Sequence, residues 1–209
     1  MNRVVVTGIG IVSSLGNNQQ EVKDSLYNTK SGISFDEDQK KMGFRSCVSG
    51  QIKIDLENSI ERKFLRFMGD GASYNYLSML EAIKDSNLSE DEISNNKTGL
   101  IMGSGGPSTK SLLRAFDITR EKGPKKIGPT SVPKVMCSTN SATLSTYFKI
   151  KGVNYSISSA CSTSAHCIGN AYELIQMGKQ NRVFAGGGEE LDWTLSALFD
   201  AMPALSSKY

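Results

Sequence analysis

A run of small side chains around Cys161, at residues 157–166, contains the residue types best suited to chemistry. The pattern predicts a strand that stops, a sharp turn of small residues and a helix that begins at or near Cys161. This is the construction of a nucleophile elbow, here with a thiol. The free amides at the start of the helix and its positive dipole end favour the thiolate, and small neighbours let a substrate approach it. Cys161 is therefore the candidate nucleophile.

A buried structural cysteine is the alternative interpretation of Cys161, because free cysteine is commonly buried. A helix dipole worth about 1 kcal/mol lowers the pKa of a thiol by only about 0.7 unit. The helix alone therefore does not make a strong nucleophile, and composition leaves both interpretations open.

His166 is the only histidine and the first candidate for a base. On one helix, five residues at about 100° each place it about 140° round from Cys161. We therefore expect His166 to be a core residue, and its neighbour Cys167 does not face Cys161 either. A base for Cys161 has to come from elsewhere. A single histidine with no second ligand at helical spacing also gives no support for a metal site.

Two glycines near the N-terminus, Gly8 and Gly10, suggest a dinucleotide-binding fingerprint. The third position of that fingerprint requires Gly or Ala and is occupied by Ser13. We expect the glycines to permit tight backbone packing instead. No P-loop is present, so the sequence gives no support for a nucleotide site.

The elements that must position Cys161 alternate between strands and helices. We expect strands at residues 4–12, 100–102, 155–157 and 183–185, and helices at 61–87 and 161–177. The β-branched run at 4–12 predicts a strand buried on both faces. Gly69 and Gly71 predict a break within 61–87. This order of elements predicts an α/β fold built in layers.

The remaining regions carry weaker patterns. Asn17 and Asn18 are candidate N-caps of a short helix, and residues 32–50 are expected to be mostly loop. Residues 108–130 look like an insertion, with a helix followed by a basic loop at 120–126.

Composition places the chain among ordinary globular proteins. Its 209 residues predict one to two domains, and 38% hydrophobic with 22% charged side chains suit a buried core. The net charge of +3 is too small to indicate nucleic-acid binding. No apolar run reaches the roughly 18 residues of a transmembrane helix, and no secretory signal is expected. Four cysteines without a CxxC pair then favour a reduced cytoplasm.

Three segments together, residues 5–16, 158–166 and 184–190, resemble the β-ketoacyl-acyl carrier protein synthases, and residues 199–206 fit as well. The details are more similar to the type I condensing enzyme of bacterial fatty acid synthesis than to type II. The resemblance implies the thiolase fold, in which two βαβαβαββ halves related by a pseudo-twofold axis form five layers, αβαβα.

The resemblance covers essentially the whole chain but only the N-terminal half of the family's fold. Residues 1–209 would be that half, with an insertion at about 108–150. The family's two catalytic histidines, its lysine and a glycine-rich oxyanion loop belong to the C-terminal half. We therefore expect a truncated chain with marginal solubility and little or no condensing activity by itself.

The resemblance also implies a reaction. Cys161 would attack an acyl thioester and hold the acyl group covalently, with its own backbone amide as one oxyanion donor. Malonyl-carrier protein would then lose CO2, and its carbanion would attack the acyl-enzyme in a Claisen condensation. The family acts as a homodimer without a cofactor.

Further site residues follow from the same resemblance. Gly105 would lie at the bottom of the acyl pocket, Met136 would reach the neighbouring subunit's pocket, and Phe199 would line the acyl channel. Ordinary core packing is the alternative for Met136 and Phe199.

Five basic residues would face the acidic acyl carrier protein, since positive charge steers an acidic partner. They are Arg62, Lys63, Arg66, Lys122 and Lys125. A solvated helix face is the alternative interpretation.

Two rival functions remain open. A polyketide ketosynthase would share the cysteine motif and differ in carrier protein and product. A non-catalytic chain-length or binding subunit is the other, although such subunits usually lack the cysteine that this chain has at position 161.

Overall fold

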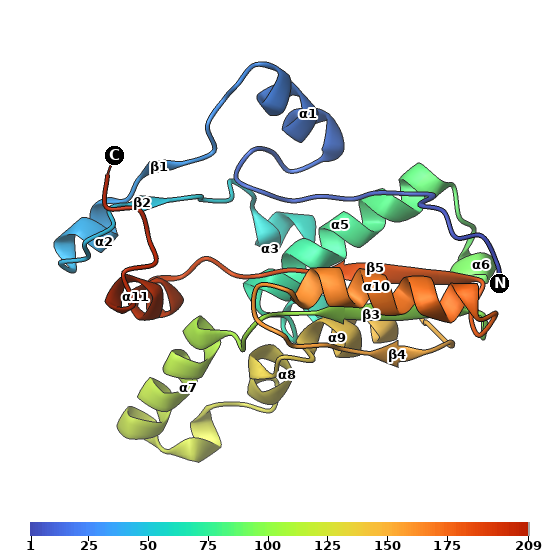
Figure 1. Cartoon of the computed structure of the whole chain (residues 1–209). Coiled ribbons are helices and arrows are strands. Elements are labelled where there is room, and N and C mark those ends of the chain that lie inside the picture. The colour runs from blue at the N-terminus through green and yellow to red at the C-terminus, as the bar shows by residue number, and fades with distance from the viewer. Residues whose placement is uncertain (209) are drawn as a thin grey trace.

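Three parallel strands form the central sheet of the computed structural model, which describes residues 1–208 (Figure 1). The middle strand is β3 (Thr98–Gly103), with β4 (Asn154–Tyr155) on one side and β5 (Arg182–Gly187) on the other. All six residues of β3 are buried, because helices cover both faces of the sheet. A continuous apolar run such as Leu100–Met102 is typical of a strand in that environment.

The two faces of β3 pack against different helices. Leu100 and Met102 belong to one core cluster with residues of α5 (Asp70–Ser86) and α9 (Thr139–Tyr147). Ile101 points to the opposite face, where it packs with buried residues of α10 (Thr163–Gln176). This alternation follows from the two-residue period of a strand. The predicted α/β layers are confirmed around β3, and Figure 1 shows α10 on the near face of the sheet.

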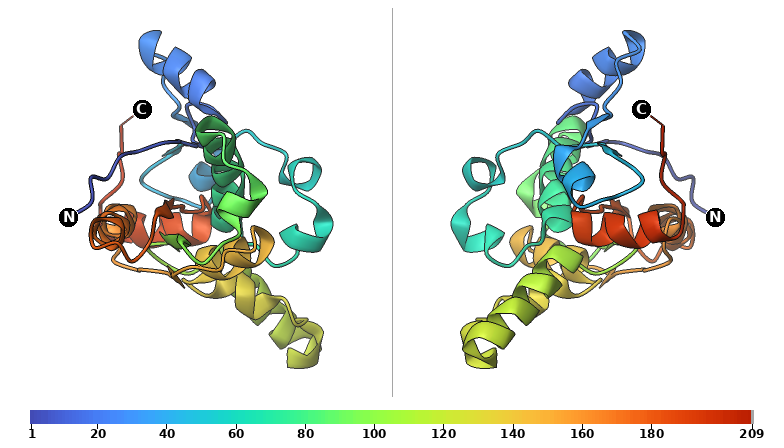
Figure 2. Two further views of the ribbon diagram at one scale, coloured as in Figure 1. Left: turned by 90° about the vertical axis from the view of Figure 1, so that its right-hand side faces the viewer. Right: turned by 90° about the vertical axis from the view of Figure 1, so that its left-hand side faces the viewer.

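The remaining elements surround this core. They are α1 (Gln19–Tyr27), β1 (Ser34–Phe35), α2 (Glu37–Lys41), β2 (Val48–Ser49), α3 (Leu56–Ser59), α4 (Arg62–Leu65), α6 (Glu90–Ile93), α7 (Thr109–Lys122), the 3-10 helix η1 (Pro124–Lys126), α8 (Ser131–Val135) and α11 (Trp193–Ala201). Figure 2 shows α7 and η1 as an arm that projects from the body of the molecule.

Two predicted helix boundaries are confirmed. Asn18 caps α1 by accepting a hydrogen bond from the Glu21 backbone N–H. Gly69 is the N-cap of α5, so the predicted break between two helices, α4 and α5, is confirmed there, whereas Gly71 lies in the first turn of α5. The segment at 32–50, expected to be mostly loop, instead contains a short antiparallel pair, β1 and β2, with α2 between them.

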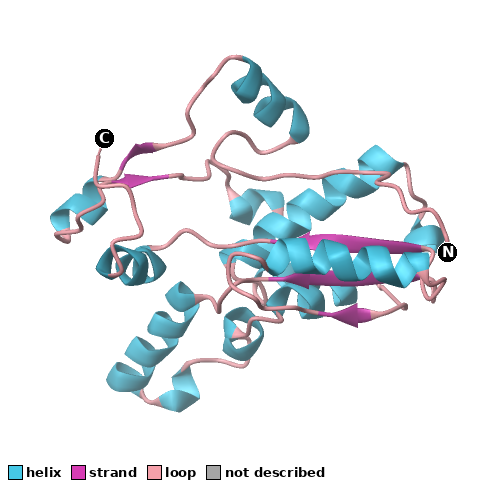
Figure 3. Ribbon diagram, viewed as in Figure 1, coloured by secondary structure: helices cyan, strands magenta, loops and turns pink. Residues whose placement is uncertain are grey.

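The strand expected at residues 4–12 is wrong. Among the described residues this segment is extended chain without a sheet partner, and Figure 3 draws it as loop. Val5 is 59% exposed and Val6 is 80% exposed. A β-branched run favours a strand only where a neighbouring strand completes the ladder, and no described strand adjoins this one.

Helix α5 holds this extended segment instead. The Ile9 backbone N–H donates to Asp85 Oδ2 at 2.9 Å, and the Ile11 backbone N–H donates to Glu81 Oε2 at 2.9 Å. A Cβ on Gly8 or Gly10 would collide with the α5 backbone. The expectation that these glycines permit close backbone packing is therefore confirmed.

Candidate active site

Cys161 lies in the turn between β4 and α10, two residues before α10 begins at Thr163. Its side chain is exposed. The alternative of a buried structural cysteine at this position is therefore wrong. That description fits Cys167 instead, which is fully buried against the sheet and whose thiol pKa is raised by burial.

The residue before Cys161 has an unusual backbone conformation. Ala160 has φ = 51°, in the left-handed region that a side chain disfavours. Its carbonyl oxygen accepts hydrogen bonds from the backbone N–H of Thr163 at 3.1 Å and from Thr163 Oγ1 at 2.8 Å. Within residues 1–208, the backbone N–H of Cys161 donates to no hydrogen-bond acceptor. The turn thus presents an exposed thiol beside a free amide, at the start of a fourteen-residue helix.

The loop that contains Gly105 packs closely against this turn. A Cβ built on Gly105 would lie 2.9 Å from the carbonyl oxygen of Ala160. The structure therefore brings Gly105 to the Cys161 turn, whereas the space beside Gly106 is open. The role of Gly105 in an acyl pocket stays a prediction.

Two glutamates after β5 fix the loop that contains Gly105. Glu189 accepts from the Gly105 backbone N–H at 2.5 Å and from Ser104 Oγ at 2.9 Å. Glu190 accepts from Ser108 Oγ at 2.7 Å and from the Lys110 backbone N–H at 3.2 Å, at the start of α7.

The pKa of Glu190 is raised, chiefly by burial. In the sequence Glu189 and Glu190 stand out only as part of a motif, and their structural role is not predicted from it. The available signal was a pair of carboxylates directly after a buried strand and a glycine run.

His166 is exposed, so the prediction of a core histidine is wrong. The buried face of α10 runs through Thr163, Cys167 and Ala171, and His166 lies off that face. Because Cys161 precedes the helix, the helical angle between the two residues does not apply. His166 Nδ1 instead forms a 2.7 Å hydrogen bond with Ser159 Oγ, in the turn that presents Cys161.

The other predicted pocket residues lie on separate elements. Met136 is half-buried at the end of α8, and Phe199 lies at the surface of α11. In the described chain, no hydrogen bond or ring contact joins either residue to the Cys161 turn. Their roles stay predictions.

The predicted basic residues form two separate groups, all exposed. Arg62, Lys63 and Arg66 lie on α4 and its C-cap, where Lys63 pairs with Glu61 at 2.7 Å. Lys122 and Lys125 lie at the tip of the α7–η1 arm, and Figure 2 shows this arm and α4 on different parts of the surface.

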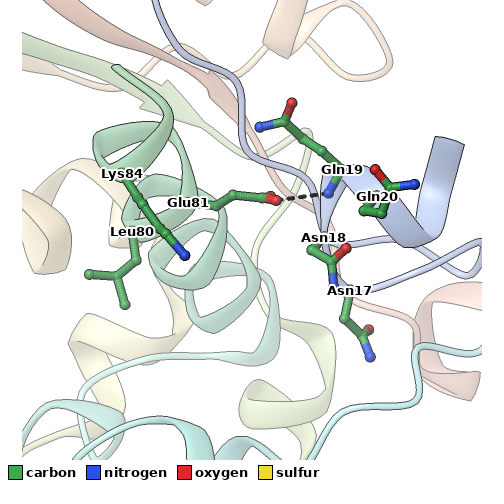
Figure 4. A pocket seen from close by; sticks show the side chains of 7 residues that line it. All are labelled: Asn17, Asn18, Gln19, Gln20, Leu80, Glu81 and Lys84. Carbon is green, nitrogen blue, oxygen red and sulfur yellow. Dashed lines mark hydrogen bonds between the residues drawn. The ribbon is translucent and has the colours of Figure 1, made fainter. Parts of the chain in front are cut away.

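An open pocket of about 570 Å³ lies between α1 and α5 and includes no residue of the Cys161 turn. Figure 4 shows its lining residues, among which Glu81 accepts from the Gln19 backbone N–H at 2.8 Å. The lining contains neither a thiol nor a histidine. This pocket therefore offers no candidate nucleophile, and Cys161 stays the predicted one.

Residues 1–208 contain no group of three or more His, Cys, Asp or Glu side chains that could hold a metal ion. No helix in the same range is both long and apolar enough to cross a membrane.

Comparison with known proteins shows the family of this chain. The sequence matches the family described as "Beta-ketoacyl synthase, N-terminal domain" over residues 1–209. The chain belongs to the β-ketoacyl synthase family. The resemblance carried by the cysteine motif is thereby confirmed.

Two relatives of this β-ketoacyl synthase chain are named 3-oxoacyl-[acyl-carrier-protein] synthase 1. The protein from Haemophilus influenzae is 55% identical over 210 residues, and that from Escherichia coli is 56% identical over 211 residues. Each match covers all of this chain and 52% of the relative. The chain therefore spans about half the length of the curated relatives it matches.

A β-ketoacyl synthase from Burkholderia phymatum has a similar structure, with a TM-score of 0.88 at 30% identity. The match covers all of this chain and 52% of that one. The β-ketoacyl synthase chain thus has a thiolase-like fold, as expected, and corresponds to its N-terminal half.

Proposed function

We propose that the protein carrying this chain is a 3-oxoacyl-[acyl-carrier-protein] synthase of fatty acid biosynthesis, with Cys161 as its nucleophile. The observation that carries the proposal is the exposed thiol of Cys161 beside its own free backbone amide, at the start of α10. The chain is also 55% identical to a synthase of that name.

The first half-reaction transfers an acyl group to Cys161. The thiolate lone pair attacks the carbonyl carbon of an acyl thioester, and the carbonyl oxygen takes the negative charge. The Cys161 N–H is suited to stabilise this oxyanion, because a preorganised backbone donor acts where the charge develops. When the carbonyl re-forms, the bond to the donor sulfur breaks and the donor leaves as a thiolate, which water protonates.

The second half-reaction lengthens the acyl chain by two carbons. Malonyl-carrier protein loses CO2, and the resulting carbanion attacks the carbonyl carbon of the acyl-enzyme. The bond to Cys161 Sγ then breaks and the thiolate is regenerated. The family resemblance assigns the histidines for this step to the C-terminal half of the fold, so the chain alone is expected to acylate but not to condense.

Other features of the proposal rest on the family. Gly105, Met136 and Phe199 would line the acyl site. The basic residues of α4 and of the α7–η1 arm would bind acyl carrier protein. The protein would be a cytoplasmic homodimer, with residues 1–209 as its N-terminal synthase half and residues 108–150 as an insertion in it.

Intact-mass spectrometry after incubation with an acyl carrier protein thioester tests the proposal. We expect one acyl group per chain, located on Cys161 by peptide mapping, and no acyl group on Cys161→Ser. Absence of acylation would instead favour a non-catalytic subunit. Product analysis of the complete protein with malonyl-carrier protein separates a single two-carbon extension from polyketide synthesis.

A further inference from the structure

The side chain of Thr163 is hydrogen-bonded to the peptide that joins Ala160 to Cys161. Because a peptide bond is planar and trans, the Ala160 carbonyl and the Cys161 N–H form one rigid unit and point in opposite directions. The Ala160 carbonyl oxygen accepts from Thr163 Oγ1 at 2.8 Å and from the Thr163 backbone N–H at 3.1 Å. The hydrogen bonds that hold the Ala160 carbonyl in one direction therefore also hold the Cys161 N–H in one direction.

Thr163 is itself held on two sides. It is 2% exposed, and its Oγ1 accepts a hydrogen bond from the Ser159 backbone N–H at 2.8 Å. Its methyl carbon packs so near the end of β3 that a Cβ on Gly103 would come within 2.8 Å of it. The hydroxyl thus spans Ser159 and Ala160, while the methyl group fills the space above β3.

The conformation of Ala160 explains why such support is needed. Left-handed backbone costs a residue with a side chain about 1–2 kcal/mol, so it persists only where the surroundings impose it. The Thr163 hydroxyl, on one side of the carbonyl, and Gly105, against it on another, supply that constraint.

We infer that Thr163 is a positioning residue, whose hydroxyl aims the Cys161 N–H at the oxyanion formed when a thioester is attacked. The inference rests on the proposed function. In that step the Cys161 thiolate bonds to the carbonyl carbon, the carbonyl oxygen becomes anionic, and the donor thiolate then leaves and takes a proton from water.

Two substitutions separate the hydroxyl from the methyl group. Thr163→Val keeps the shape and removes the hydroxyl, whereas Thr163→Ser keeps the hydroxyl and removes the methyl. Two rates are measured on the complete protein that carries this chain. Alkylation of Cys161 by iodoacetamide forms no oxyanion, and acylation by an acetyl thioester of N-acetylcysteamine does.

Thr163→Val is expected to slow acylation by about tenfold or more. The loss should not exceed the roughly 10²–10³-fold that follows complete removal of an oxyanion donor. Its alkylation rate should match wild type, which also shows that the turn has folded. Thr163→Ser should recover most of the acylation rate. The matched control is Thr143→Val on α9, which removes a 2.7 Å hydrogen bond to Thr139 O and should not slow acylation.

Several outcomes overturn the inference. If Thr163→Val slows alkylation and acylation equally, the substitution has disrupted the whole turn. If acylation is unchanged, the Thr163 hydroxyl does not orient the Cys161 N–H. In both cases wild type is acylated, so the proposed function stands. If wild-type Cys161 is alkylated but never acylated, the proposed function fails and the inference fails with it.

Discussion

Gly105 lies directly against the carbonyl oxygen of Ala160, the residue that precedes the candidate nucleophile. A Cβ on Gly105 would come within 2.9 Å of that oxygen and 3.2 Å of Glu189 Oε1. Neither oxygen can move away easily. The Ala160 oxygen belongs to the backbone, and the Glu189 carboxylate is held by hydrogen bonds to the loop that contains Gly105. A Cβ built on the neighbouring Gly106, in contrast, would meet no atom within 4 Å apart from its own neighbours in the chain.

Gly105→Ala is therefore expected to displace the Ala160–Cys161 peptide and to slow acylation of Cys161. A misplacement of about 1 Å at reacting groups can cost about a hundredfold in rate. Acylation by an acetyl thioester measures the effect, because so small a group makes little demand on an acyl pocket. Gly106→Ala is the matched control, and equal rates for the two variants would contradict this prediction.

The cysteines should differ sharply in reactivity. Cys161 is exposed, whereas Cys167 is buried and its raised pKa reduces the thiolate that reacts. Brief treatment with iodoacetamide followed by peptide mapping should label Cys161 and leave Cys167 unmodified until the protein is denatured. Labelling of Cys167 in the folded protein at the rate of Cys161 would show that Cys167 is not buried between α10 and the sheet.

Asp200 should make the stability of the protein depend on pH. Its carboxylate accepts from the backbone N–H groups of Arg45 at 3.1 Å and Ser46 at 2.9 Å, and these bonds lower its pKa. A lowered folded-state pKa stabilises the folded protein above the unfolded-state pKa of about 3.9. That stabilisation is lost as the pH falls through the folded-state pKa.

Asp200→Asn should therefore lower the free energy of unfolding at neutral pH, and the difference from wild type should shrink in acid. Urea unfolding at several pH values measures it. Asp38→Asn is the control, because among the described residues its side chain pairs only with the exposed Lys41 on the same helix. A difference from wild type that does not change with pH would argue against this role of Asp200.

The basic residues should bind carrier protein by charge. Arg62 and Arg66 form no ion pair with a described residue and are exposed on and next to α4. Reversing both to Glu should slow association with acyl carrier protein by about tenfold or more at low salt, since steering contributes factors of about 10–10³. High salt should reduce the difference.

The corresponding reversal of Lys122 and Lys125 tests the α7–η1 arm separately. Reversal of Lys149 and Lys151, which are also exposed, is the control. Stopped-flow association rates compare the three pairs. An equal effect of the control pair would mean that only net charge matters and that neither group is a docking site.

Local patterns in the sequence predicted much of this structure. Asn18 begins α1 and Gly69 separates α4 from α5, because caps and glycines act on their own backbone. The run at 100–102 forms the buried strand β3. The small residues around Cys161 place the thiol at the start of α10, since they make a sharp turn possible.

Tertiary structure alone decided the rest, because it depends on contacts between residues far apart in the chain. The run at 4–12 has strand-forming side chains, yet it lies along α5, and no described strand pairs with it. His166 is exposed because α10 packs on the sheet through a different face, the one that carries Thr163 and Cys167. Spacing in the sequence also cannot show that Glu189 accepts a hydrogen bond from Gly105, 84 residues earlier in the chain, and so holds Gly105 against Ala160. The sequence determined which residues could carry the chemistry, and packing determined what holds them in place.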